Sequence, residues 1–413
     1  MKKFWRENWL LILIFALALS LRLYVLFTEG DRLYLGTDDK NYVKSAETLI
    51  RTGMLTYGGW PGPTVFVMPA YPFLLSSIFI LAGSTNWLAV RLVQVVISLA
   101  ALWFSVKLGE RLGGRWVGLL TGLILAVYPP NLTAPAFLMT EVVFTFCLLL
   151  SVYCFDRAAE SGELKWFIYT GAALGLETYF RPTAGLLPVV FFVYLLLCSG
   201  YSLKRAVYVT IVTGLVPVLL LSPWIIRNYR VFHEFIPFTV SGGNPLLRGT
   251  YIDDKIIIPP NDPSKRFPQV KDNHVLTDRA QMKFAKKRLV EGFKTDFWGY
   301  LRWYTIGKFT DFWGGPYYYR ELSYLPAPKV QAFHNLLLVA GVGGLLVSLL
   351  RRKYLAFLML MVSAYFTFIH MVYLTGPRYG FPTVQLLAVL AAYALIEGGK
   401  VILAVGHTNR KLR

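Results

Sequence analysis

Two adjacent carboxylates, Asp38 and Asp39, are the residues of this chain best suited to chemistry. They follow the first hydrophobic stretch by a few residues and open a short segment that is predicted to be helical. The positive end of a helix dipole would keep a carboxylate ionised, and an ionised carboxylate at a membrane surface can act as a general base. The alternative is that both acids only cap an exposed helix, a position that Asp favours.

Two further acids stand near the ends of apolar stretches. Glu141 begins one of them, where an acid is costly unless it faces a cavity or a partner; the alternative is a helix cap that reaches back to water. Glu177 precedes Arg181 by four residues, the favourable order for an ion pair on a helix. This spacing predicts either a structural pair or a free Arg181 that binds phosphate, because a guanidinium matches phosphate oxygens with two hydrogen bonds.

Three more cations, Arg227, Lys308 and Arg378, stand at predicted span ends or in a long loop. Each alone is typical of an anchor at the lipid–water interface. Together with Arg181, and gathered around one acid cluster, they would form a phosphate-binding site. We therefore predict that these four cations bind a phosphate group.

Three residues are assigned to a pocket for an acceptor or a sugar: Tyr42, Tyr71 and Glu177. No metal ligands are predicted, because the histidines show no paired spacing and the three cysteines all fall in apolar stretches. Distant residues could still converge on a divalent metal, but nothing in the sequence supports one.

The elements that must position these residues are membrane helices. Of 413 residues, 55% are hydrophobic and 16% are charged, whereas soluble domains carry about 25% charged residues. The apolar residues fall in stretches long enough to cross a hydrocarbon core of about 30 Å. We predict an all-α polytopic membrane protein with about ten transmembrane helices, at 9–27, 86–107, 114–130, 138–156, 166–182, 184–199, 206–224, 331–350, 354–375 and 380–397. The apolar stretch 69–83 is short for a span, and we predict an interfacial or re-entrant helix there.

The net charge of +19 does not point to nucleic acid, because the basic residues cluster between apolar spans. Such clusters mark cytoplasmic loops. They predict a cytoplasmic N-terminus and place Asp38 and Asp39 on the extracytoplasmic side. The first apolar stretch lacks a small-residue cleavage site, which favours a retained helix over a signal peptide.

Three regions follow from this topology. Residues 1–224 are predicted to form a transmembrane catalytic core with a first outer loop at 28–85. Residues 225–330 form a long extracytoplasmic loop with an amphipathic helix from 278 to about 293 and an aromatic, basic segment at 298–313 that suits the interface. Residues 331–413 hold the C-terminal transmembrane helices.

The order of short motifs along the chain is similar to that of a known family. The motifs are Asp38-Asp39-x-x-Tyr42-x-x-x-Ala46, 68–75 (MPAYPFLL), Thr140-Glu141, Arg181-Pro182, Pro223-Trp224-x-x-Arg227-Asn228, Lys308-Phe309-x-x-Phe312-Trp313 and Pro377-Arg378-Tyr379-x-Phe381-Pro382. This order resembles the GT-C glycosyltransferases of the protein O-mannosyltransferase and aminoarabinose-transferase type, the family 39 type, in a shorter form. Each motif alone is weak, and the resemblance covers most of the chain.

The resemblance implies a polyprenyl-phosphate sugar as donor and catalysis on the outer face of a plasma (inner) membrane. It makes Asp38 the catalytic carboxylate, Glu141 the second acid and Arg181 a ligand of the lipid phosphate. The family's acidic pair is usually Asp-Glu, so Asp39 departs from it by one methylene, and the family's metal-binding residues do not map onto this chain. Two roles remain for Asp39: it either positions the acceptor or only caps the helix.

Three other functions fit the sequence less well. A transporter or flippase of lipid-linked glycans usually shows repeated halves and helices broken at the midplane, and neither is clear here. A ligase or polymerase of lipid-linked glycans would use a diphosphate donor, and a membrane scaffold would need no acids. The expected partners are the lipid-linked donor, membrane lipids and an acceptor that could be protein, lipid or polysaccharide; the sequence does not identify the sugar, the acceptor or the oligomeric state.

Overall fold

The computed structural model describes residues 2–58, 60–254, 267–270 and 273–411, with side chains from residue 8 to residue 400 within these ranges. The side chains of the terminal basic residues Lys2, Lys3, Arg6, Arg410 and Lys411 lie outside the described ones. Residues 255–266 and 271–272 of the predicted extracytoplasmic loop at 225–330 also lie outside the described residues. Within the described part the only β-structure is an isolated bridge between Leu322 and Leu325.

Seven of the described helices are long and apolar enough to cross a membrane. They are α1 (Lys2–Glu29), α4 (Trp87–Gly113), α7 (Glu141–Ser161), α10 (Leu203–Phe232), α15 (Ala327–Leu350), α16 (Tyr354–Val372) and α17 (Pro377–Lys411). The prediction of an all-α, multi-pass membrane protein is confirmed. Helix α10 continues beyond the boundary predicted at 224, because Pro217 and Pro223 are accommodated inside it.

The other three predicted spans are shorter or broken. The span predicted at 114–130 is a bent pair, α5 (Arg115–Val127) followed by α6 (Pro129–Thr133) and η2 (Ala134–Ala136), with an angle of 66° between its halves. Pro129 and Pro130 explain the break, because proline lacks an N–H donor and displaces the preceding residue from helical geometry. Helices α8 (Leu164–Phe180) and α9 (Leu187–Cys198) have only 17 and 12 residues. By length and composition the described chain has seven or eight spans, so the count of ten remains a prediction.

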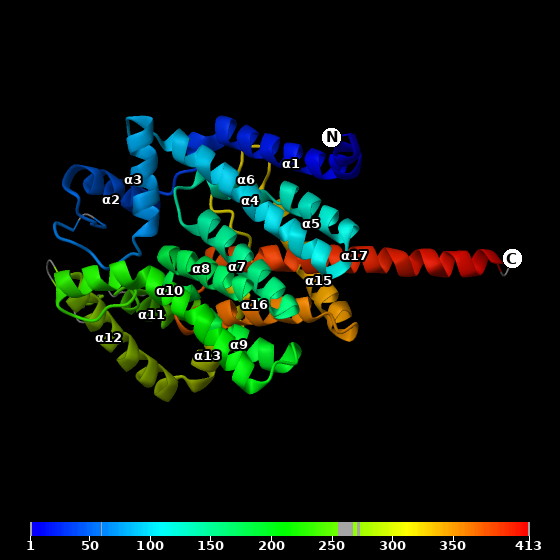
Figure 1. Cartoon of the computed structure of the whole chain (residues 1–413). Coiled ribbons are helices and arrows are strands. Elements are labelled where there is room, and N and C mark those ends of the chain that lie inside the picture. Colours follow the sequence, from blue (N-terminus) through cyan, green and yellow to red (C-terminus); the bar gives the residue numbers. More distant parts are fainter. Residues whose placement is uncertain (1, 59, 255–266, 271–272, 412–413) are drawn as a thin grey trace.

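One end of the helix bundle carries the short helices. Helix α2 (Asp38–Thr52) and helix α3 (Ala70–Ala82) come from the first loop, and α3 runs across the direction of α1 and α17 (Figure 1). This orientation agrees with the prediction that 69–83 does not cross the membrane. The long loop adds α11 (Gly243–Gly249), α12 (His274–Thr295), α13 (Phe297–Arg302), the π-helix η6 (Trp303–Gly307) and α14 (Lys308–Trp313). Three 3-10 turns complete the chain: η1 (Gly30–Arg32), η3 (Pro182–Ala184) and η4 (Ile252–Asp254).

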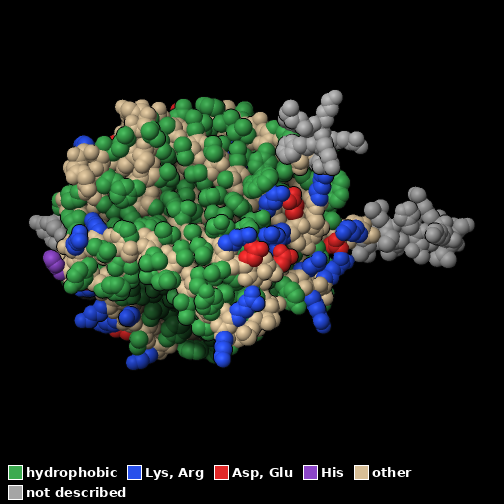
Figure 2. Space-filling view, in the orientation of Figure 1, with side chains coloured by type: hydrophobic (Ala, Val, Ile, Leu, Met, Phe, Trp, Pro, Cys, Tyr) green, Lys and Arg blue, Asp and Glu red, His purple; other side chains and the backbone are tan. Residues whose placement is uncertain are grey.

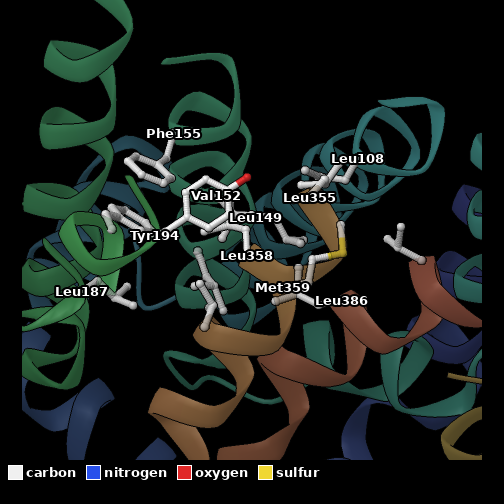
Figure 3. Packing of buried hydrophobic residues seen from close by; sticks show 14 of the residues in the cluster. Leu108, Leu149, Val152, Phe155, Leu187, Tyr194, Leu355, Leu358, Met359 and Leu386 are labelled. Carbon is white, nitrogen blue, oxygen red and sulfur yellow. The ribbon is translucent and has the colours of Figure 1, made fainter. Parts of the chain in front are cut away.

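The core of the bundle forms around α7. Leu149 and Val152 of α7 pack against Tyr194 of α9 and against Leu358 and Met359 of α16 (Figure 3). The outer face of the bundle is dominated by hydrophobic side chains, while Lys, Arg, Asp and Glu gather toward the two ends (Figure 2). That distribution is expected of a helical bundle whose middle faces lipid.

Small residues allow α15 and α17 to pack closely. A Cβ atom placed on Gly344 would lie 1.8 Å from the carbonyl oxygen of Leu390, and one on Gly341 would lie 3.0 Å from that of Leu387. Small residues at such positions let membrane helices approach each other. This contact holds the C-terminal helix in the bundle, with its first turn at the same end as α2 and α3.

Candidate active site

Four charged side chains from four helices meet at the end of the bundle that carries α2 and α3. Arg378 Nη1 donates to Asp38 Oδ2 at 2.7 Å, and Arg378 Nε donates to Glu141 Oε1. Arg181 Nη2 donates to the same Glu141 oxygen at 2.5 Å. Glu141 and Arg181 are largely buried, whereas 38% of the Asp38 side chain is exposed. Arg378 therefore bridges the two acids, Arg181 pairs with Glu141, and Asp38 is the most exposed of the four side chains.

Arg181 reaches this site because it leaves its helix. It is the C-cap of α8 and has extended geometry, with φ −146° and ψ 125°. The following Pro182 favours this conformation, since proline disfavours helical geometry in the residue before it. Arg181 Nε then donates to Thr140 Oγ1 at 2.8 Å. The alternative of a structural pair with Glu177 is wrong, because Glu177 stays on α8, fully buried, and accepts a hydrogen bond from Ser151 Oγ at 3.0 Å.

Asp38 is held by a hydrogen bond that the sequence did not reveal. Tyr57 Oη donates to Asp38 Oδ1 at 3.0 Å. Gly53 ends α2 in the left-handed conformation at φ 68°, which a glycine adopts without strain, and turns the chain back so that Tyr57 reaches the start of the helix. Burial alone would raise the pKa of the Asp38 carboxyl. The charge and hydrogen bond of Arg378, the hydrogen bond of Tyr57 and the charge of Arg181 outweigh burial, so the pKa lies below its ordinary value and Asp38 is ionised at neutral pH.

Asp39 has a different environment, although it is the next residue. Its side chain is buried, and its two oxygens accept four backbone N–H groups, from Leu35 at 2.7 Å, Gly36 at 3.3 Å, Thr37 at 2.8 Å and Lys40 at 2.9 Å. These bonds satisfy the free N–H groups of the loop and of the first helical turn. Asp39 therefore fixes the loop that presents Asp38.

Three helices begin at this site: α2 at Asp38, α7 at Glu141 and α17 at Pro377. The N-terminus of a helix carries a partial positive charge and unpaired N–H groups, so it attracts anions. Tyr379 lies near both guanidinium groups, with its ring centre 6.0 Å from the Arg181 carbon and 5.9 Å from that of Arg378. In the sequence, Tyr379 stands out only because it follows Arg378 in the motif at 377–382, and nothing in the sequence singles out Tyr57.

The other predicted site residues lie elsewhere. Arg227 Nη1 donates to the carbonyl oxygen of Thr64 at 2.8 Å. Lys308 is buried and its Nζ donates to the carbonyl oxygen of Tyr373 at 2.8 Å. Burial lowers the pKa of Lys308 to about 7, partly opposed by the charge of Asp311. The structure therefore does not bring Arg227 or Lys308 into contact with the acid cluster.

Tyr42 and Tyr71 are part of the core beneath α2. Their ring centres lie 4.9 Å apart, and both belong to a buried cluster with α3. Tyr71 Oη donates to Gln94 Oε1 at 3.0 Å, so its hydroxyl is already partnered. These rings support the start of α2, and they line neither of the two large cavities of the described chain beside the first loop.

Two large cavities flank the first loop. A polar one of about 680 Å³ is lined by Asp38, Asn41, Tyr57 and Trp60, and by α12 residues that include His274 and Gln281. An apolar one of about 650 Å³ lies between α3, α8 and α10, and is lined by Phe73, Tyr179, Trp224 and Arg227 among others. Volumes of this size are typical of ligand sites. Of these two cavities, only the polar one is lined by Asp38.

The acid cluster does not fit a divalent metal. A cation held by Asp38 and Glu141 would have to lie between them, and the Arg378 guanidinium already takes that position. Within the described ranges no three His, Cys, Asp or Glu side chains come close enough to hold a metal ion.

Comparison with known proteins supports the fold predicted from the motifs. Residues 63–226 match the family model described as dolichyl-phosphate-mannose-protein mannosyltransferase. The structure of ArnT from Cupriavidus metallidurans bound to undecaprenyl phosphate is similar, with a TM-score of 0.61 and 15% identity over 97% of this chain and 63% of that chain. The archaeal oligosaccharyltransferase AglB from Archaeoglobus fulgidus, in complex with an inhibitory peptide and a dolichol-phosphate, has a TM-score of 0.61 and 14% identity over 99% of this chain and 52% of that one.

This chain therefore spans less than two thirds of the length of either structure. No curated protein sequence matches it. The structural likeness confirms the GT-C fold that the motif order predicts.

Proposed function

We propose that this protein is a membrane glycosyltransferase that moves a sugar from a polyprenyl-phosphate donor to an acceptor hydroxyl. The single observation that carries the proposal is the bridge formed by Arg378 between Asp38 and Glu141, completed by Arg181. It places an ionised carboxylate beside two cations, the combination required to deprotonate an acceptor and to stabilise a departing phosphate.

The two arginines bind the phosphate of the donor. A guanidinium has five N–H groups, and Arg181 and Arg378 each use two of their nitrogens within the part of the chain that the structure describes. N–H groups of both side chains thus remain for phosphate oxygens. Glu141 is a positioning residue, because it fixes both guanidinium groups from one buried oxygen.

The apolar cavity takes the polyprenyl chain. Tyr179 lines it and precedes Arg181 by two residues, so the cavity begins close to the phosphate site. Its walls from α3, α8 and α10 are mostly hydrophobic side chains, which favour a hydrocarbon chain over water. ArnT was solved with undecaprenyl phosphate and AglB with a dolichol-phosphate, two lipids of this class.

The reaction is a single displacement. The acceptor oxygen forms a bond to the anomeric carbon of the sugar while the bond from that carbon to the phosphate oxygen breaks. The acceptor proton passes to Asp38, and the bonding pair leaves with the polyprenyl phosphate. Attack from the face opposite the leaving group inverts the anomeric centre, through an oxocarbenium-like transition state.

The site faces the extracytoplasmic side of a plasma membrane in this proposal, with the N-terminus in the cytoplasm. Basic side chains gather at the opposite end of the bundle, among them Lys107, Arg111, Arg157 and Arg352. Clusters of this kind mark the cytoplasmic side of membrane proteins. Asp38 lies at the other end.

Sugar transfer by the purified full chain in lipid nanodiscs tests this function. The donors are undecaprenyl phosphates that carry mannose, galactose, glucose or 4-amino-4-deoxyarabinose, and release of the sugar to water or to an acceptor is measured. We expect turnover with at least one donor, and a loss of about 10²–10⁴-fold in Asp38→Asn, the range for a general base. The control is Asp31→Asn, because Asp31 is a fully exposed acid of the same loop. Asp38→Asn with more than a tenth of wild-type turnover, or no turnover of any donor, would contradict the proposal.

A further inference from the structure

We propose that the polar cavity beside Asp38 is the acceptor site and that it takes an uncharged saccharide. This inference rests on the proposed function, because it uses Asp38 as the base. The cavity of about 680 Å³ lies between the first loop and α12, two parts of the chain far apart in sequence. It is therefore assembled only in the folded protein.

Aromatic rings form one wall of the cavity. Tyr57 stacks on Phe66 with ring centres 5.6 Å apart, Phe66 lies 5.6 Å from the ring of His274, and His274 packs against Trp60. The face of an aromatic ring is electron-rich, so it attracts the weakly positive C–H bonds on the apolar face of a sugar ring. A continuous row of rings suits an extended ligand that presents several such faces.

Polar side chains of α12 also line the cavity. Asp278 Oδ1 accepts the N–H of Gly243 at 2.6 Å, and Gln281 Nε2 donates to the carbonyl oxygen of Pro268 at 3.1 Å. Each side chain is thus fixed through one atom, and no partner within the described residues is seen for Asp278 Oδ2 or Gln281 Oε1. Asn41 and Asn244 add amide groups to the same lining. Fixed amide and carboxylate groups recognise hydroxyl groups, because a hydroxyl both donates and accepts.

The charge of the described lining disfavours an anionic acceptor. Among the described residues that line the cavity there are two acids, Asp38 and Asp278, and no Lys or Arg. Burial lowers the pKa of His274 to about 4, so this side chain is neutral at pH 7. Asp38 is paired with Arg378, but Arg378 belongs to the phosphate site and is not part of this lining. A phosphate or carboxylate on the ligand would therefore meet two carboxylates and no cation among the described lining residues. An uncharged acceptor meets no such penalty.

Asp38 lies between the two substrates in this arrangement. Its Oδ2 faces Arg378 and the phosphate site, and its carboxylate also borders the polar cavity. A saccharide hydroxyl in the cavity would give its proton to Asp38 while its oxygen bonds to the anomeric carbon of the donor sugar. The polyprenyl phosphate leaves toward the arginines, so the atoms and charges balance without a further reactant.

Binding to the purified full chain tests the inference, with tryptophan fluorescence and calorimetry as readouts. The probes are mannotriose, galactotriose and N-acetylchitotriose, a mannotriose that carries a 6-phosphate, and an uncharged Ser/Thr-containing peptide. We expect saturable binding of at least one neutral trisaccharide, and at least tenfold weaker binding of the phosphorylated mannotriose and of the peptide. Trp60→Ala and Gln281→Ala should each weaken trisaccharide binding at least tenfold. Trp298→Ala is the matched control, because Trp298 is 75% exposed and does not line the cavity.

Hydrolysis of the lipid-linked donor is measured in parallel without acceptor, and it should persist in Trp298→Ala, which lies outside the cavity. Donor turnover without any trisaccharide binding would overturn this inference and leave the proposed function standing. Equal or tighter binding of the peptide or of the phosphorylated sugar would also overturn it. Trisaccharide binding without turnover of any donor would instead contradict the proposed function.

Discussion

Replacing Arg378 by Gln should move the pH dependence of sugar transfer. Asp38 must be ionised to take a proton, so activity is lost as the pH falls through the pKa of its carboxyl group. In the wild type this pKa lies below its ordinary value, because the positive charge of Arg378 is among the groups that outweigh burial. The acid limb of the wild-type profile is therefore expected at a lower pH than an ordinary aspartate would give.

The size of the shift follows from the geometry. Arg378 Nη1 lies 2.7 Å from Asp38 Oδ2. Unit charges centred about 4 Å apart attract by about 4 kcal/mol near a protein surface and by about 1 kcal/mol in water. Because 38% of the Asp38 side chain is exposed, solvent screening brings the value to about 1–2 kcal/mol. This corresponds to an upward shift of about one pKa unit in Arg378→Gln.

The assay is kcat/KM for a lipid-linked sugar donor between pH 3 and pH 8, since this ratio reports the pKa values of the free enzyme. Arg378→Gln should raise the midpoint of the acid limb by about one pH unit, in addition to weakening donor binding. Arg378→Lys keeps the positive charge and should leave the midpoint close to that of the wild type. Lower activity with an unchanged midpoint in Arg378→Gln would show that Arg378 does not tune Asp38, and this reasoning would be refuted.

Three further predictions concern stability. Asp39→Asn puts an amide N–H₂ group against backbone N–H donors, so it should lower the free energy of unfolding by about 1–3 kcal/mol and lower the thermal midpoint accordingly. An unchanged midpoint would contradict the capping role. Gly344→Ala should lower the thermal midpoint in detergent, because the new Cβ would meet the carbonyl oxygen of Leu390. Overpacking of this kind costs about 1–3 kcal/mol of folding free energy. Gly343→Ala is the control and should leave the midpoint unchanged, because a Cβ there meets nothing within 4 Å. Burial holds the pKa of Lys308 near 7, below the ordinary value of 10.5, so the unfolded chain binds more protons between these pH values. Wild-type stability should consequently rise with pH across that window, and Lys308→Met should flatten the rise; a rise of equal slope in both proteins would argue against the shift.

Local patterns were sufficient to predict the helices. The apolar stretches predicted at 86–107 and 331–350 are found as α4 and α15, and the amphipathic segment is found as α12. The start of a helix at Asp38 was also predicted correctly. Hydrophobic periodicity and helix-end residues act over a few turns, so a single sequence contains them. Helix breaks depend on packing as well, and this is why Pro129 breaks a predicted span whereas Pro223 does not.

The contacts of the site required the tertiary structure. The sequence by itself determined that Asp38, Glu141, Arg181 and Arg378 stand at helix ends on one predicted side of a membrane. It did not decide that Glu141, rather than Glu177, would pair with Arg181, or that Arg378 would bridge two acids. Those partners are 40 and 237 residues apart in the chain. Only the packing of α2, α7, α8 and α17 brings them within hydrogen-bond distance, because a side chain pairs with the groups that the fold places beside it.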